Sequence, residues 1–154
     1  MESSKQNNEL VFDEIRRKNV PATPEELVRQ SLLYIMLHRL KYPRELIAIE
    51  KSLSELPHLK KIPGLPERRA DIICFAKNIH PDYPLFPLLL IECKEGILGT
   101  EAIQQALGYN HYVRAPFIAV AGSDGVRLIY PQDVPFLPSY AQLMETLLNE
   151  KSSH

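Results

Sequence analysis

The sequence predicts an α/β fold with a central mixed β-sheet of about four to five strands, flanked by helices. The segments with helical or strand patterns follow one another as helix, three strands, helix, two strands and helix. Residues 88–91 are apolar at every position, which is typical of a central strand covered on both faces. The length of 154 residues and the hydrophobic content of 45% suit one domain. We expect this domain at residues 23–150, after an N-terminal arm or hairpin at residues 1–22.

The first helix has a strong start signal. The Thr23 hydroxyl can cap the helix, Pro24 suits the first helical position, and Glu26 would complete a capping box. Apolar residues then recur on one broad face as far as residue 40. Because Pro43 disfavours helical geometry in the residue before it, we expect the helix to end near residues 41–42.

The strands are expected on both sides of a second helix. The pattern predicts the first core strand at residues 46–53 and a loop rich in proline at residues 55–67. Two apolar runs, at residues 69–75 and 88–94, should pair as an antiparallel hairpin. A helix with Thr100 as its cap should follow at residues 101–113. The remaining segments are two strands around a glycine-rich turn, at 117–121 and 126–130, and a last helix at 139–149.

Composition narrows the class of protein. No apolar run approaches the roughly 20 residues of a membrane span, and residues 1–8 lack the form of a signal peptide. Cys74 and Cys93 lie in apolar strands and resemble small buried hydrophobes. We therefore expect a cytoplasmic protein that contacts no membrane. The sequence contains no phosphate-binding Gly-x-x-x-x-Gly-Lys-Ser/Thr motif, so we expect no nucleotide partner.

Three charged residues stand out at the ends of the central strands. Glu92 and Lys94 share one face of a strand because alternate side chains point the same way. Asp71 begins the other strand of the predicted hairpin and would lie beside them. On the central strand alone, a structural ion pair is as good an explanation as a functional site. The convergence with Asp71 favours the functional one.

This trio matches the requirements of metal-assisted phosphodiester hydrolysis. Mg²⁺ takes oxygen ligands and usually only one or two protein carboxylates. We expect Asp71 and Glu92 to bind it, with Mn²⁺ as a substitute, and the backbone carbonyl of Cys93 to add a ligand. Lys94 would hold the attacking water or stabilise the charge of the transition state.

These residues also carry a resemblance. Asp71 and Glu92-Cys93-Lys94 resemble the PD-(D/E)xK nuclease signature. Over residues 10–130 the chain resembles the N-terminal nuclease domain of type I restriction endonuclease R subunits and their small stand-alone relatives. The matching stretches are residues 11–13, 16–18, 23–30, 42–43, 46–51, 69–72 and 90–94. The resemblance implies a restriction-endonuclease-like fold and metal-dependent cleavage of DNA.

The resemblance also implies roles for residues outside the trio. Gln105 and Tyr109 match a Gln-x-x-x-Tyr motif, and their spacing places both on one helical face, where they would hold DNA or simply form a polar edge. Glu50 corresponds to an acid near the metal site, and is either a further ligand or a strand-edge charge without a role. Glu26 is expected to be a helix cap and not a catalytic acid.

Basic residues would complete the DNA-binding surface. Arg68 and Arg69 adjoin Asp71, where a phosphate backbone would pass, and Lys60 and Lys61 lie in a long loop that we interpret as a DNA-facing flap. A lone nuclease fold would have to find DNA as a homodimer or through recruitment by another DNA-processing protein. The net charge of −1 favours recruitment or a narrow binding cleft over free scanning of DNA. The alternative function is a catalytically silent DNA- or protein-binding module with the same fold.

Overall fold

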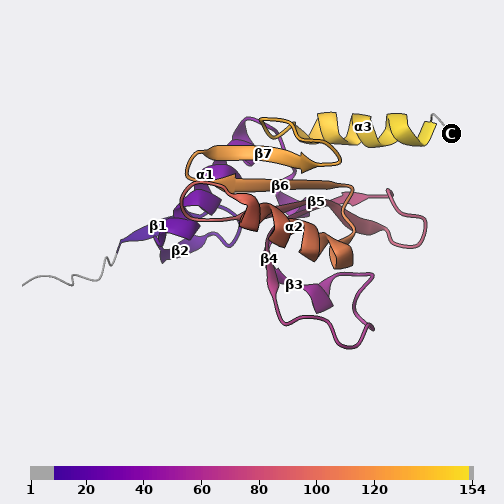
Figure 1. The fold of residues 1–154 in the computed structure, drawn as a ribbon, viewed down its shortest axis with the longest axis horizontal. Coiled ribbons are helices and arrows are strands. Elements are labelled where there is room, and N and C mark those ends of the chain that lie inside the picture. The colour runs from indigo at the N-terminus through magenta and orange to yellow at the C-terminus, as the bar shows by residue number, and fades with distance from the viewer. Residues whose placement is uncertain (1–8, 153–154) are drawn as a thin grey trace, which may run out of the picture.

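The computed structural model describes residues 9–152 as a five-stranded sheet with helices on both faces and a separate small hairpin (Figure 1). The expectation that residues 1–8 carry no signal segment lies outside this range. The order of elements confirms the predicted α/β class. The elements are β1 (Leu10–Asp13), β2 (Lys18–Pro21), α1 (Pro24–His38), β3 (Ile47–Ser52), β4 (Arg69–Lys77), β5 (Leu85–Cys93), α2 (Thr100–Val113), β6 (Phe117–Gly122), β7 (Gly125–Tyr130) and α3 (Tyr140–Ser152).

The large sheet has the strand order β3-β4-β5-β6-β7. Its β5–β6 pair is parallel and the other neighbours are antiparallel, so the sheet is mixed as predicted. A parallel pair needs a long crossover connection, and α2 supplies it. The predicted hairpin of β4 and β5 is present, with Ile72 opposite Ile91 and a loop at residues 78–84. The small hairpin of β1 and β2 packs beside α1.

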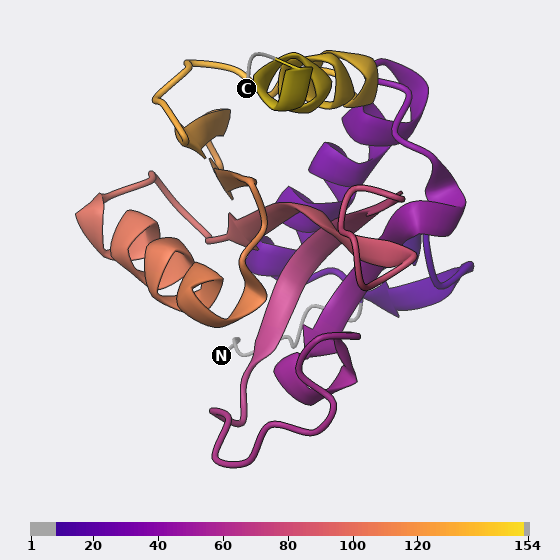
Figure 2. The ribbon, with the colours of Figure 1, turned by 90° about the vertical axis from the view of Figure 1, so that its right-hand side faces the viewer.

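The helices divide between the two faces of the sheet. Figure 2 shows α2 on one side and α1 with α3 on the other. Leu33 of α1 and Leu143 of α3 pack in one cluster with Ile72 and Ile91 of the central strands. Val113 of α2 packs in a second cluster on the opposite face. The β5 strand is buried on both faces, as its continuous apolar run predicts. Both cysteines are buried and free, which confirms the prediction for them.

Several predicted boundaries differ from those in the structure. Helix α1 ends at His38, before the predicted residues 41–42, because Lys41 takes a left-handed φ of 58° and turns the chain. The Tyr42 N–H then bonds to the Met36 carbonyl oxygen at 2.9 Å. The predicted strand at residues 46–53 is shorter, since short 3₁₀ turns occupy 44–46 and 53–55. Thr100 was wrongly expected to cap α2: it lies inside the helix, and Gly99 holds the cap position without a side-chain bond.

The loop that follows β5 is fixed against the end of β6. The Lys94 N–H donates to the Ala121 carbonyl oxygen at 2.9 Å, and the Ser123 N–H donates to the Gly96 carbonyl oxygen at 2.9 Å. A Cβ atom on Gly122 would lie 2.7 Å from that Gly96 oxygen, so only glycine allows this close approach. The position of Lys94 therefore depends on backbone contacts. None of the helices in residues 9–152 has the length and hydropathy needed to span a bilayer.

Candidate active site

Asp71 and Glu92 lie side by side on neighbouring strands. Ile72 pairs with Ile91, so the next positions outward along the two antiparallel strands are Asp71 and Glu92. The Cys93 N–H donates to Asp71 Oδ2 at 2.8 Å, which fixes this carboxyl group against β5. The side chain of Cys93 itself is buried in the core on the α1 face, opposite to that of Glu92. The structure thus brings together the two acids that the sequence predicts to converge.

The two carboxyl groups are hard to ionise together. Glu92 is only 5% exposed, and its Oε2 atom is buried without a hydrogen-bond partner. Burial, together with the adjacent charge of Asp71, raises the pKa of Glu92 from 4.5 to about 8. Burial also raises the pKa of Asp71, although the Cys93 N–H opposes this shift. Ionisation of both carboxyl groups at once is therefore unfavourable in the absence of a cation.

Lys94 directly follows the last residue of β5 and is two positions after Glu92. Its side chain is partly exposed, and its charge lowers the pKa of both Asp71 and Glu92. A cation at this position can contact a substrate that approaches the two acids. The structure thus places the predicted trio of Asp71, Glu92 and Lys94 at one end of the sheet.

The chemistry of the two acids fits a hard divalent cation. Mg²⁺ needs few protein ligands when water and substrate oxygens complete its coordination. Two adjacent carboxyl groups, one of them with an unpartnered buried oxygen, supply suitable ligands that gain from neutralisation. Residues 9–152 contain no cluster of three or more His, Cys, Asp and Glu side chains arranged to hold a metal ion. The fit therefore depends on this carboxylate pair.

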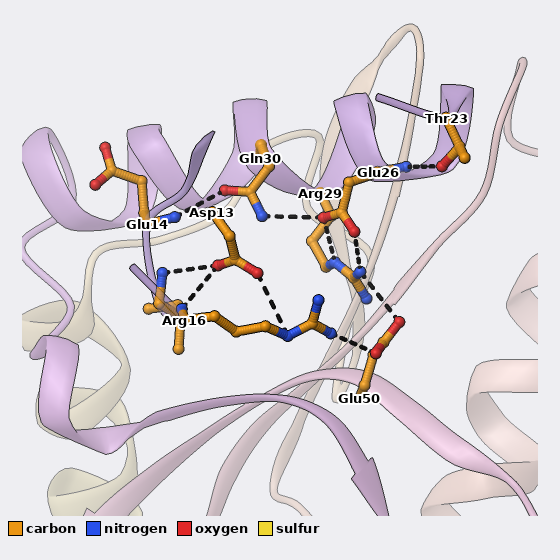
Figure 3. Close-up of polar contacts among 9 residues, drawn as sticks. Asp13, Glu14, Arg16, Thr23, Glu26, Arg29, Gln30 and Glu50 are labelled. Carbon is orange, nitrogen blue, oxygen red and sulfur yellow. Dashed lines mark hydrogen bonds and ion pairs between the residues drawn. The ribbon is translucent and has the colours of Figure 1, made fainter. Parts of the chain in front are cut away.

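Glu50 is held by two arginines (Figure 3). Arg16 Nη2 pairs with Glu50 Oε2, and Arg29 Nη2 lies 3.2 Å from Glu50 Oε1. Glu50 follows Ile49, the partner of Ile72, and has a left-handed φ of 49° that interrupts the regular pairing of β3. This bend directs Glu50 toward α1 and the β1–β2 hairpin, at the same end of the sheet as Asp71. Both Glu50 oxygens are engaged by cations.

Glu26 is part of the same ionic network. The prediction that Thr23 caps α1 is confirmed, since its hydroxyl accepts a hydrogen bond from the Glu26 N–H at 3.1 Å. The Glu26 carboxylate does not reach back to complete a capping box. It accepts hydrogen bonds from Arg29 Nε at 3.0 Å and Gln30 Nε2 at 2.9 Å, because the buried guanidinium of Arg29 needs a counter-charge. Burial alone would lower the pKa of Arg29, but the bond to Glu26 raises it.

Glu25 and Glu95 are additional acids that the sequence reasoning missed. They line a cavity of about 530 Å³ together with Arg16, Arg29 and Glu50, at the start of α1. Burial, reinforced by the nearby charge of Asp71, raises the pKa of Glu25. In the sequence, an acid at position 25 is accounted for by the start of a helix, because acidic residues are common in the first helical turn. Only the packing of the α1 start against the ends of β4 and β5 shows that it lies near the site.

The predicted Gln-x-x-x-Tyr pair lies on α2, above the sheet face that carries Glu92. Tyr109 is buried, and the guanidinium carbon of Arg68 lies 4.5 Å from the centre of its ring. Burial raises the pKa of Tyr109, and the charges of Glu92 and Asp71 add to this shift. The Gln105 Oε1 atom is buried without a hydrogen-bond partner. Arg68 and Tyr109 thus form one unit beside the two acids.

The remaining predicted DNA contacts are on the surface. Arg69 begins β4, opposite Ser52, and is exposed. Lys60 and Lys61 are exposed on the long loop between β3 and β4, which packs through Leu56 and Leu59 against the α2 side of the sheet. Their positions leave all three side chains accessible to a large ligand.

Comparison with known proteins gives one family. A profile of the family described as type I restriction enzyme R protein N terminus matches residues 24–136. This span includes α1, the whole large sheet and α2, and so both acids of the carboxylate pair. Of the residues described around the pair, it leaves out Thr23 and those of the β1–β2 hairpin. No curated protein and no solved structure matches the chain.

Proposed function

Because the chain belongs to the family of type I restriction enzyme R protein N termini, we propose that it is a metal-dependent DNA endonuclease. Asp71, Glu92 and Lys94 are the catalytic residues in this proposal. The observation that carries it is the pair of adjacent carboxyl groups near a lysine, with Glu92 almost fully buried. Such a pair is costly to the fold unless a cation neutralises it.

The residues have separate roles in the proposed reaction. Asp71 and Glu92 would hold Mg²⁺, aided by the Cys93 carbonyl, with Glu50 as a further candidate. Bound there, Mg²⁺ would supply Lewis-acid stabilisation and a more acidic water. Lys94 donates hydrogen bonds toward the scissile phosphate and the water, and stabilises the charge that develops on the phosphate oxygens.

Substrate binding would use the face next to the acids. Arg68 stacks on Tyr109 and presents its donors to a phosphate, while Gln105 offers an amide from the same helix face. Arg69, Lys60 and Lys61 would add charge-dependent contacts to the DNA backbone. We further propose a cytoplasmic protein that acts as a homodimer or with another DNA-processing protein. Sedimentation of the purified chain tests the dimer.

The cleavage test uses substitutions at the trio with matched controls. Asp71→Ala and Lys94→Ala should each lower the cleavage of plasmid and single-stranded DNA in Mg²⁺ or Mn²⁺ at least about 100-fold, as removal of a transition-state contact does elsewhere. Asp133→Ala and Lys18→Ala change exposed residues of the same types and should cut at the wild-type rate. Cleavage that persists in both trio variants would disprove the assignment.

A second measurement separates the nuclease from a catalytically silent binding module. The module is favoured by one observation, since both Glu50 oxygens are already occupied by arginines. Calorimetry with Mn²⁺ should detect metal uptake by the wild type that Glu92→Ala abolishes and that Glu145→Ala, at an exposed position of α3, preserves. DNA binding without any metal uptake would instead support the silent module.

A further inference from the structure

A second cavity lies at the opposite end of β5 from Glu92. It measures about 380 Å³, which is in the size range of small-ligand sites at about 300–1,000 Å³. Its walls come from the loop between β3 and β4, the loop between β4 and β5, and the C-terminal end of α2. Figure 1 shows both loops on the side of the molecule where α2 ends. Aromatic and imidazole rings form most of its lining: His58, His80, Tyr83, Phe86, His111 and Tyr112.

The rings form a cluster that leads outward from the core and contains one stacked pair, His80 on Phe86. Phe86 is buried, and its ring centre lies 4.7 Å from that of His58 and 4.5 Å from that of His80, the latter at an interplanar angle of 24°. The Tyr83 ring lies 5.0 Å from that of His80 and is tilted by 54° to it. His80 and Tyr83 are partly exposed, so the outer end of the cluster is accessible. A flat aromatic ligand can stack on these outer rings.

The surroundings favour an anionic ligand. Arg114 is exposed and lines the cavity, and Lys60 and Lys61 lie between two of its lining residues on the β3–β4 loop. Asp82 is the acid in the β4–β5 loop, where its N–H donates to His80 Nδ1 at 3.0 Å. His58 Nε2 donates to the Tyr112 carbonyl oxygen at 3.1 Å, which holds the loop against α2. Rings with nearby cations suit bases joined by phosphates.

Helix α2 connects this cavity to the carboxylate pair. Tyr109, beside Arg68 and the two acids, is three residues from Tyr112, and residues at this spacing share a helix face. Glu92 follows Phe86 by six positions along β5, which is about 20 Å of extended chain. A nucleic-acid strand with a rise of about 3.4 Å per nucleotide spans that distance in about six nucleotides.

From this geometry we infer that the His80–Tyr83 cavity is a stacking site for an unpaired base, so that the preferred ligand is single-stranded DNA or a DNA end with a single-stranded overhang. This inference rests on the proposed function, because it names the form of DNA that the same protein would bind. Duplex DNA keeps its bases paired and cannot place one in the cavity without unstacking it.

The test measures binding without cleavage. Fluorescence anisotropy of a labelled 12-nucleotide oligo(dT) in EDTA should show that Tyr83→Leu and His80→Leu each weaken affinity roughly 5- to 150-fold, the range for loss of one base stack. Tyr34→Leu, which removes an exposed ring from α1 on the other face, should bind as the wild type does. Circular dichroism checks that each variant is folded. If one of the two cavity variants fails to fold, the other still tests the inference.

Three further results separate the explanations. An abasic oligonucleotide of equal length has no bases to stack, so it should bind weakly and with equal affinity to the wild type and all variants. If the cavity substitutions weaken the binding of the abasic oligonucleotide as much as that of oligo(dT), the cavity binds phosphate only and the inference is overturned. Wild-type affinity for oligo(dT) in both cavity variants would also overturn it and would leave the cavity to a protein partner. Binding measured in EDTA does not depend on Asp71, so this test is independent of the cleavage test. If oligo(dT) binding depends on Tyr83 but the protein does not cleave DNA, the stacking site stands and the proposed nuclease function falls.

Discussion

The substitution Glu92→Gln should stabilise the metal-free protein, and increasingly so as the pH rises. Burial beside Asp71 raises the pKa of Glu92 from 4.5 to about 8. Between these values the folded state binds more protons than the unfolded state, so the free energy of unfolding falls with increasing pH. Below pH 4.5 both states are protonated and the effect disappears. Above pH 8 the full penalty of a buried carboxylate is present.

The size of the effect follows from the shift. At about 1.36 kcal/mol per pKa unit, the wild type loses about 1 kcal/mol at pH 5 and about 4 kcal/mol at pH 8. The glutamine removes the ionisation while keeping the shape of the side chain. The difference in free energy of unfolding between Glu92→Gln and the wild type should therefore widen by about 3 kcal/mol over this interval.

Urea unfolding in EDTA at several pH values measures this difference directly. Glu101→Gln, at an exposed position in the first turn of α2, is the matched control and should follow the wild type at every pH. A gap between Glu92→Gln and the wild type that stays constant from pH 5 to 8 would refute the reasoning. Under the proposed function, Mn²⁺ at pH 8 should stabilise the wild type but not Glu92→Gln.

Three other substitutions test the framework around the site. Arg29→Met should destabilise the protein by roughly 3–5 kcal/mol, because it leaves the carboxylates of Glu26 and Glu50 without their shared buried cation. Thr23→Ala should cost about 1 kcal/mol through loss of the α1 cap. Gly122→Ala should cost roughly 1–3 kcal/mol, since its methyl group meets the loop after β5. Thermal or urea unfolding at pH 7 measures all three.

Each of these has a control elsewhere in the chain. Arg17→Met removes an exposed arginine whose ion pair is 3.9 Å long, and should change stability little. Thr146→Ala changes an exposed threonine inside α3, and Gly108→Ala adds a methyl group where no atom lies within 4 Å. If a control loses as much stability as its counterpart, the stated contact is not the cause.

The fold could be predicted from sequence because its strongest signals are local. The continuous apolar run of β5 required burial on both faces, and the Thr23-Pro24 pair marked the start of α1. The convergence of Asp71 with Glu92 followed from antiparallel pairing of two adjacent runs. The end of α1 and the cap of α2 were wrong because tertiary contacts, such as those of buried Tyr42, override local preference.

The surroundings of the site could not be predicted in the same way. The bond between Glu26 and Arg29 replaces a capping box because Arg29 is buried, and burial at one helix position is set by what packs on it. The left-handed Glu50 has no sequence signature. The ring cluster at His80 joins three segments from different parts of the chain, and no spacing rule relates them.

The link between Arg16 and Glu50 bears on where the chain can be trimmed. The family match starts at residue 24, yet the β1–β2 hairpin that supplies Arg16 lies before it. The hairpin turn is held by Asp13, which is fully buried, and by the bond from Arg44 Nη1 to the Glu14 carbonyl oxygen. A recombinant fragment limited to residues 24–136 would lack Arg16, one of the two cations that pair with Glu50 of β3, and would expose the side of α1 that the hairpin covers. Residues 9–22 therefore belong in any minimal version of this protein.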